Sequence, residues 1–183
     1  MSDDREYEAI TYEVPAEGVV RIMLDRPEVA NAQNKQMLYE LNAGFDRAVA
    51  DDDIKVIILG ANGKHFSSGH DLRDRSSFDD FDTVGPVGGF SKPGDEGMMA
   101  REEEVYLGFC SRWRVLPKPT IAQVHGKVIA GGLMLMWPCD LVVASEDATF
   151  SDPVVAFGVN GVEYFAHAFE FGPRRAKELL FTG

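Results

Sequence analysis

Short, continuous apolar runs recur along the chain, and they constrain its fold more than any other feature. "VIILG" (56–60), "TIAQV" (120–124) and "LVVAS" (141–145) have the length and the β-branched composition of strands, and the first of them is expected to be buried on both faces of a sheet. "VVRIML" (19–24) reads as a further strand, with which residues 10–14 can pair across the turn at "PAEG". Helical patterns separate these runs. The alternation predicts an α/β fold with parallel strand pairing.

Three segments carry helical signals. Asn34 is a suitable cap for a helix that reaches about Ala50 and whose apolar residues recur at helical spacing. A second helix is expected over 101–116. A third is expected from Pro173, a residue suited to a first helical turn, to Phe181. Residues 73–97 are rich in Asp, Gly and Pro, and we expect them to form a mobile surface segment.

The bulk composition limits the possible functions. A chain of 183 residues suits one domain with a substantial core. Its net charge of −12 argues against broad nucleic-acid binding, which needs clustered cations. Two separated cysteines suggest reduced thiols in a cytoplasmic protein, and no stretch resembles a signal peptide or a membrane span. Because the sequence stops at "LLFTG", directly after a helix, we expect a single domain over 1–183 that lacks its C-terminal part.

Two glycine-centred turns follow buried strands: Ser67-Ser68-Gly69-His70 and Ala130-Gly131-Gly132. Ligands of parallel α/β sheets gather at the carboxyl ends of strands, and glycine lets backbone amides approach them closely. Two such amides could converge on one oxygen atom. Simple connecting turns are the alternative. No phosphate-binding glycine motif is present, and the four His and two Cys lack metal-ligand spacing, so no metal site is predicted.

Taken together, five segments resemble the crotonase family, also called the enoyl-CoA hydratase/isomerase family. They are "LDRPEVANAQN" (24–34), "HFSSGHDL" (65–72), "PKPTIAQVHGKVIAGG" (117–132), "CDLVVASEDATFSDP" (139–153) and "GPRRAKELLFTG" (172–183). The resemblance implies a spiral of β-β-α repeats that binds a coenzyme A thioester. It also implies trimers or dimers of trimers, a role in fatty acid metabolism, and no cofactor beyond the coenzyme A of the substrate. In the family, further helices follow the last of these segments, so the C-terminal helical part is expected to be missing here.

The resemblance assigns roles to positions. The backbone N–H groups of His70 and Gly131 would polarise the thioester carbonyl. The coenzyme A would lie along residues 26–32 and 68–72, and the positions implied are Arg26, Ala30, Ala32, Ser68, Gly69, Asp71 and Leu72. Arg26 and Lys35 could offset phosphate charge. Each could instead be a solvated surface cation, and for Lys35 we favour that alternative. For Asp71 we favour a structural acid bonded to turn amides.

Both acids of family hydratases are absent. The corresponding positions hold Met134 and Val154, which can neither activate water nor deliver a proton. Glu163 is the best replacement, although related isomerases and dehalogenases place their acid one residue earlier, at Val162. An exposed first-turn glutamate is an equally strong interpretation of Glu163. Tyr164, Asp152 and the imidazole of His70 are further options; Tyr164 more often packs in the core, and Asp152 could simply pair or cap locally.

These observations predict an acyl-CoA-binding protein that is an inefficient hydratase. One alternative is an enzyme of another reaction of the family, such as isomerisation, decarboxylation or thioester hydrolysis, using Glu163 or His70. The other is a catalytically silent acyl-CoA-binding or scaffold subunit.

Overall fold

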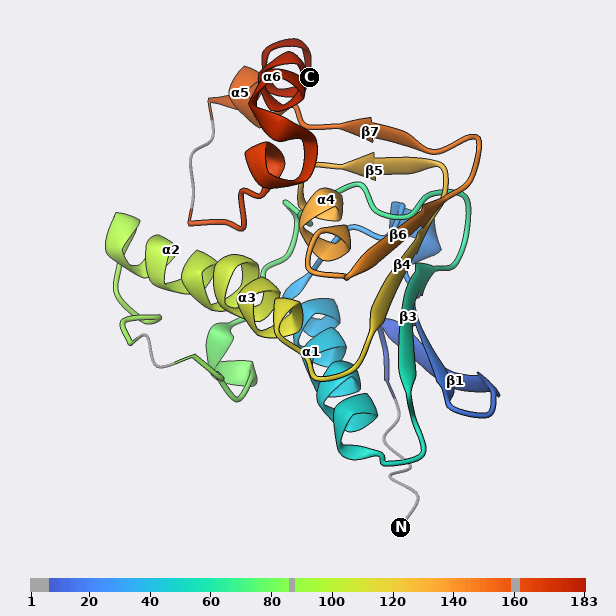
Figure 1. Ribbon diagram of the computed structural model, residues 1–183. Coiled ribbons are helices and arrows are strands. Elements are labelled where there is room, and N and C mark those ends of the chain that lie inside the picture. The colour runs from blue at the N-terminus through green and yellow to red at the C-terminus, as the bar shows by residue number, and fades with distance from the viewer. Residues whose placement is uncertain (1–6, 86–87, 159–161) are drawn as a thin grey trace.

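A five-stranded sheet forms the centre of the molecule. The computed structural model describes residues 7–85, 88–158 and 162–183. The strand order is β1-β2-β3-β4-β6, with β1 and β2 antiparallel and all later neighbours parallel, as the sequence predicts (Figure 1). The strands are β1 (Ile10–Ala16), β2 (Val19–Leu24), β3 (Val56–Ala61), β4 (Thr120–Val124) and β6 (Leu141–Ala144).

A second, two-stranded sheet lies beside the first. It pairs β5 (Lys127–Ile129) with β7 (Thr149–Ser151) in parallel. The chain therefore leaves β4, forms β5 and turns directly into a short helix, α4 (Gly131–Met136). This arrangement places the second glycine turn at the carboxyl end of β5 rather than of β4.

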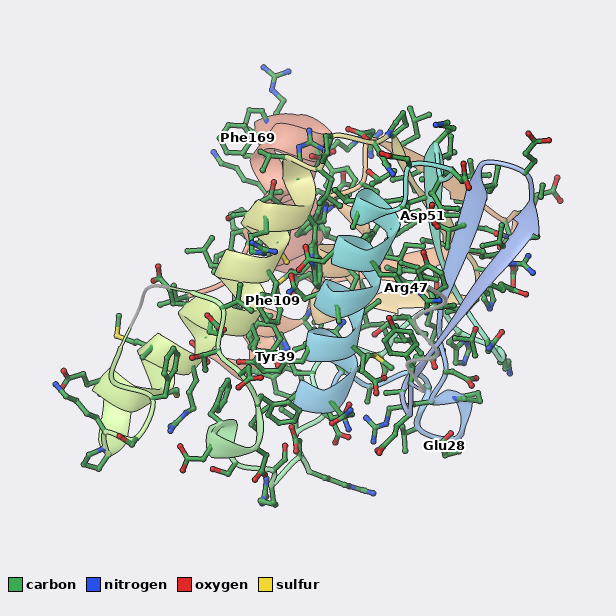
Figure 2. The ribbon with its side chains drawn as sticks, turned by 90° about the horizontal axis from the view of Figure 1, so that it is seen from below. Glu28, Tyr39, Arg47, Asp51, Phe109 and Phe169 are labelled. Carbon is green, nitrogen blue, oxygen red and sulfur yellow. The ribbon has the colours of Figure 1, made fainter. Side chains whose placement is uncertain are left out.

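Helix α1 (Lys35–Ala50) packs on the main sheet beside β1 and β2. Asn34 caps this helix, since its side chain accepts a hydrogen bond from Met37 N at 3.0 Å. Figure 2 shows α1 beside the helical rod formed by α2, η3 and α3, with Tyr39 and Phe109 between them; these two rings meet edge to face with centroids 5.1 Å apart. The remaining helices are α2 (Gly94–Glu102), the π-helix η3 (Glu103–Gly108), α3 (Phe109–Arg114), α5 (Val154–Phe157), α6 (His167–Thr182) and the 3-10 helices η1 (Pro27–Val29) and η2 (Phe78–Asp80).

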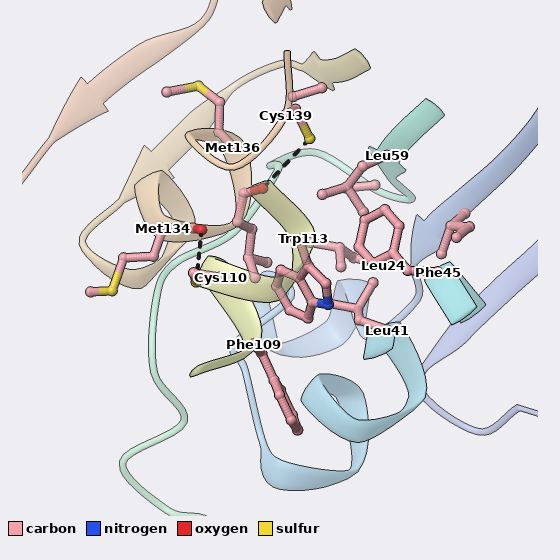
Figure 3. Close-up of a cluster of buried hydrophobic side chains, with 14 of the residues drawn as sticks. Leu24, Leu41, Phe45, Leu59, Phe109, Cys110, Trp113, Met134, Met136 and Cys139 are labelled. Carbon is pink, nitrogen blue, oxygen red and sulfur yellow. Dashed lines mark hydrogen bonds between the residues drawn. The ribbon is translucent and has the colours of Figure 1, made fainter. Parts of the chain in front are cut away.

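The core between α1, α3 and the sheet is apolar and fully packed. Phe45 and Trp113 lie with ring centroids 5.2 Å apart and are at most 3% exposed. The indole N–H of Trp113 is satisfied, because Trp113 Nε1 donates to Asn42 Oδ1 at 3.3 Å. Figure 3 shows this cluster and, at its edge, Met134, whose side chain extends away from Trp113. All residues of α4 are buried, so the helix is part of this core.

Several predicted boundaries are wrong. The helix expected over 101–116 begins at Gly94 and ends at Arg114, so the segment 73–97 includes a helical turn, η2, and the start of α2. The strands β5 and β7 were not predicted, because three residues carry too little pattern. The last helix begins at His167, although it is interrupted at Gly172 (φ 72°), after which Pro173 starts the second half as expected.

The strand β6 forms where the sequence predicts a strand, but it is not buried. Its apolar side chains are exposed, with Leu141 at 60% and Val143 at 59%. Figure 1 shows the reason: β6 is the last strand of the main sheet, and no described element covers its outer side.

Candidate active site

The two glycine turns lie side by side. Ile129 N donates to Ser67 O at 3.0 Å, and Ser67 N donates to Lys127 O at 3.2 Å. Gly69 adopts φ 93°, which disfavours any residue with a side chain, and a β-carbon placed on it would stand 3.3 Å from Gly131 N. The turns predicted separately from the sequence therefore form one structure.

The backbone N–H groups of His70 and Gly131 are not used for hydrogen bonds within the described part of the chain. The flanking groups of the first turn are used, since Gln33 N donates to Gly69 O (2.8 Å) and Asp71 N donates to Gln33 O (2.9 Å). Within the described residues, neither His70 N nor Gly131 N donates a hydrogen bond. Ala130 precedes Gly131 with φ 47° and ψ −112°, an unusual backbone conformation for a residue with a side chain. Strain of this kind is typical of functional turns.

The His70 imidazole meets Glu163, which lies 93 residues later. His70 Nε2 is 3.1 Å from Glu163 Oε1, and the imidazole packs on the Tyr106 ring with centroids 3.8 Å apart. Glu163 is only 8% exposed, which contradicts the interpretation as an exposed first-turn glutamate. Its other oxygen, Oε2, is buried without a partner among the described residues.

Burial keeps both members of this pair neutral. Desolvation raises the pKa of Glu163 to about 7, and the nearby carboxylates of Glu102 and Asp152 add to the shift. Desolvation also lowers the pKa of His70 to about 4, although the charge of Asp152 opposes this. Between these values both groups are uncharged, so their contact is a hydrogen bond rather than an ion pair. A glutamic acid that titrates near neutrality can act as a general acid or base.

The two segments implied to bind coenzyme A lie together. Ser68 N donates to Ala30 O at 2.9 Å, and the side chains of Arg26 and Asp71 form an ion pair of 2.9 Å. Arg26 Nη1 also donates to Ala32 O at 2.6 Å, so part of its guanidinium is committed within the fold.

Some side chains in and near these segments are exposed to solvent, and others are bonded within the fold. Leu72 is 82% exposed, and Ser68 is also open to solvent. The structural role expected of Asp71 is confirmed, because its Oδ1 accepts a hydrogen bond from Arg73 N at 3.0 Å. The alternative favoured for Lys35 is wrong: its ammonium pairs with Asp74 at 2.9 Å and is largely buried. This pairing lowers the pKa of Asp74.

The two positions of the missing acids have different surroundings. Met134 is 2% exposed on α4, as expected for a packed helix, and Val154 is half-buried at the start of α5. Asp152 pairs with the buried His167 at 2.6 Å and accepts a hydrogen bond from Val154 N, which confirms its local role. Tyr164 packs against the core.

The sequence interpretation missed Gln33, which is 1% exposed and lies between the two turns. It sits in a loop without periodicity, so no local signal pointed to it. Only the fold brings it against His70 and Gly131.

The sequence model of the enoyl-CoA hydratase/isomerase family matches residues 19–165. This match covers well over half of the chain. The chain belongs to that family. The match includes both glycine turns and Glu163, and it confirms the crotonase-like fold that the sequence motifs implied.

Relatives with provisional or established hydratase and isomerase names support this assignment. The chain is 49% identical over 187 residues to the Mycobacterium tuberculosis protein EchA13, which carries a provisional enoyl-CoA hydratase name, with 98% of this chain and 59% of that protein covered. It is 32% identical to the mitochondrial Delta(3,5)-Delta(2,4)-dienoyl-CoA isomerase of Rattus norvegicus, with 85% and 46% covered.

A solved structure gives the same picture. The fold matches the crystal structure of a probable enoyl-CoA hydratase from Mycobacterium smegmatis with a TM-score of 0.82 and 50% identity, over 96% of this chain and 64% of that one. The chain thus spans roughly half to two thirds of the length of these family members.

The described residues hold no group of three or more His, Cys, Asp or Glu side chains placed to bind a metal. Nor does this part of the chain contain a helix long and apolar enough to cross a lipid bilayer.

Proposed function

We propose that this chain binds an acyl-CoA thioester, polarises its carbonyl with the amides of His70 and Gly131, and uses Glu163 to move protons. Two features carry the proposal. Two adjacent turns leave two amides without acceptors among the described residues, and a buried carboxyl group with a raised pKa contacts the imidazole of one of them. Amides aimed at a developing oxyanion are worth about 3–4 kcal/mol each in comparable sites.

The acidic side chains that are present at the site favour isomerisation over hydration. Hydration requires one group to activate water and another to protonate carbon, and neither Met134 nor Val154 can take part. Shifting a double bond requires only that a base remove a proton from one carbon and return it to another. A single carboxyl group such as Glu163 can perform both steps. The rat relative is named as an isomerase, which agrees with this chemistry.

A pocket next to Glu163 supports the placement of an acyl chain. It has a volume of about 490 Å³ and is lined by Leu107, Tyr164, Phe165, Ala166 and Phe169 together with Arg114, Glu163 and Glu170. Most of these side chains are apolar, as a hydrocarbon chain requires. We place the coenzyme A along the paired segments 26–32 and 68–72.

Product analysis tests the proposal. The chain is incubated in heavy water with crotonyl-CoA and with a 3-enoyl-CoA, and mass spectrometry separates water addition from double-bond migration with deuterium exchange. We expect migration or exchange with weak hydration. The variant Glu163→Gln should lose this turnover and keep acyl-CoA binding, while the exposed Glu146→Gln should retain both.

Two outcomes contradict the proposal. Hydration within tenfold of an ordinary family hydratase would reveal an acid other than Glu163. Binding of acyl-CoA without any turnover would identify a silent binding or scaffold subunit.

We also propose that the protein is cytoplasmic and assembles as a homotrimer or a dimer of trimers. Large exposed apolar side chains support association, among them Leu141, Phe169 (91% exposed) and Phe181 (78% exposed). Light scattering at micromolar concentration should show trimers or hexamers. A stable monomer would contradict the proposed assembly.

A further inference from the structure

The segment that carries Glu163 has no regular secondary structure of its own. Residues 163–166 lie between α5 and α6 and belong to neither helix. Their backbone hydrogen bonds are local: Phe165 N donates to Glu163 O at 3.0 Å, and Ala166 N donates to Tyr164 O at 3.1 Å. Bonds of such short range do not fix the segment against the rest of the molecule. The position of the Glu163 side chain therefore depends on an anchor outside the segment.

Glu102, the last residue of α2, supplies that anchor. Val162 N donates a hydrogen bond to Glu102 Oε2 at 3.0 Å, from 60 residues further along the chain. Among the described residues, this is the one hydrogen bond that ties the backbone of residues 162–166 to a distant part of the sequence. Figure 1 shows α2 beside this segment. The anchored amide belongs to the residue directly before Glu163, so a change at Glu102 is transmitted to the acid through a single peptide unit.

The same helical rod also supports the other member of the pair. Tyr106 follows Glu102 by four residues, within η3, and its ring packs on the His70 imidazole with centroids 3.8 Å apart. Residues four apart lie close to the same face of a helix. The segment η3 is a π-helix, a form that is frequent at functional sites. One face of the rod therefore contacts both His70 and the backbone next to Glu163.

We propose that Glu102 is a positioning residue for Glu163: its carboxylate anchors the backbone beside Glu163, keeps that side chain against His70 and adds a negative charge to the site. The catalytic meaning of this arrangement rests on the function proposed above, whereas the anchor and the charge do not.

The charge of Glu102 acts on the same residue as its hydrogen bond. A second negative charge favours the protonated form of a nearby carboxyl group. Burial is the largest cause of the raised pKa of Glu163, and among the charged groups Glu102 contributes more than Asp152. The other titratable or charged groups around Glu163 are His70, Tyr106 and Cys110, together with Arg114, Tyr164 and Glu170 of the adjoining pocket. Glu102 thus links the position of Glu163 to its protonation.

Carboxyl-carbon NMR tests the charge without any substrate. The titration of Glu163 is followed in protein labelled with ¹³C-glutamate, and the variant Glu163→Gln assigns its signal. We expect a midpoint of about 7 in the unsubstituted protein. Glu102→Gln keeps an oxygen that can accept from Val162 N and removes the charge, so the midpoint should fall by about 0.5–1 pH unit. An unchanged midpoint overturns the proposal.

Glu102→Ala tests the anchor, because it removes the acceptor as well as the charge. The amide hydrogen of Val162 should lose its partner, and its proton resonance should move to lower frequency. The displaced acid should lower kcat for double-bond migration by about tenfold or more, with little change in KM. A Val162 amide resonance that stays in place in this variant overturns the proposal.

The conservative variant and a neighbouring control separate positioning from general damage to the fold. Glu102→Gln should retain most of kcat, because the anchor remains. Its pH profile should shift at the acidic limb to lower pH by as much as the NMR midpoint, since proton removal needs ionised Glu163. Glu103→Gln removes the same charge from the next residue, whose side chain makes no hydrogen bond within the described residues, and should change neither property. An equal shift in Glu103→Gln overturns the proposal.

The NMR measurements separate this inference from the proposed function, because they need no turnover. If the Glu163 midpoint and the Val162 resonance respond as expected while no acyl-CoA is converted, the inference holds and the proposed function fails. If acyl-CoA is converted while Glu102→Gln leaves the midpoint unchanged, the proposed function holds and the inference fails.

Discussion

Glu40 and Glu163 are equally buried, at 8% exposure each, yet their surroundings differ completely. Glu40, on α1 near the start of β1, has both oxygens occupied: Oε1 accepts from Glu8 N and Gln36 Nε2, and Oε2 accepts from Ala9 N. Among the described residues, the Glu163 carboxyl group has one hydrogen-bond partner, His70, and its second oxygen has none. A buried carboxyl group with every acceptor site used stabilises the fold. One with an unused oxygen remains available for chemistry.

The contrast extends to the glycines of the two regions. Gly44 on α1 has room, because a β-carbon there would be 3.4 Å from the nearest side-chain atoms of Ile10 and Ile22. Gly131 has none, because a β-carbon there would be 2.8 Å from Gln33 Oε1. The space around Gly44 therefore accommodates an added methyl group, and the space around Gly131 does not.

Removal of the Glu40 carboxylate should give the largest effect. Glu40→Ala leaves the amides of Glu8 and Ala9 without their acceptor, and unpaired buried donors cost about 1–3 kcal/mol each, more when the lost partner is charged. We expect the free energy of unfolding to fall by about 2–5 kcal/mol in urea titrations. A loss below about 0.5 kcal/mol would show that the Glu40 carboxylate does not stabilise the fold.

Glu163→Gln should change the pH dependence of stability. The Glu163 pKa is raised from 4.5 to about 7, so its favourable contribution is fully present below pH 4.5 and is lost as the pH rises through 7. One pKa unit corresponds to about 1.4 kcal/mol, so the unsubstituted protein should lose up to about 3 kcal/mol relative to the variant over this window. Urea unfolding at pH 4.5 and pH 8 measures the difference. Equal pH slopes for the two proteins would mean that Glu163 titrates normally.

Gly131→Ala should cost about 1–3 kcal/mol of stability through overpacking and should abolish acyl-CoA turnover. The added methyl group pushes on Gln33 and His70, so His70 resonances should shift as well. Thermal unfolding and product analysis measure both effects. Full activity in this variant would show that the close packing around Gly131 has no functional role.

The smallest effect is expected for Gly44→Ala. Alanine is favoured over glycine inside a helix by up to about 1 kcal/mol, and its methyl group meets only ordinary contacts here. Thermal unfolding should therefore show a slight stabilisation with unchanged activity. A destabilised variant would mean that α1 packs more tightly against the sheet than these distances allow.

The sequence predicts the parts of the fold whose signals are local. The strand at 19–24 and the cap at Asn34 lie where the pattern places them, because alternation and capping act over a few residues. The start of α2 was missed because "SKPGDEG" reads as a loop. The motifs also pointed to the turns of His70 and Gly131, which the structure brings side by side. Gln33 could not be found, since its role depends on Ser67 and Gly131, which are distant in the sequence.

The central claim is that the His70 and Gly131 amides hold the thioester oxygen. A crystal structure with a bound, unreactive acyl-CoA analogue tests it most directly. The account predicts that the carbonyl oxygen lies about 2.7–3.1 Å from both His70 N and Gly131 N, with Glu163 facing the carbons next to the carbonyl. A bound analogue whose carbonyl oxygen contacts neither amide would contradict it.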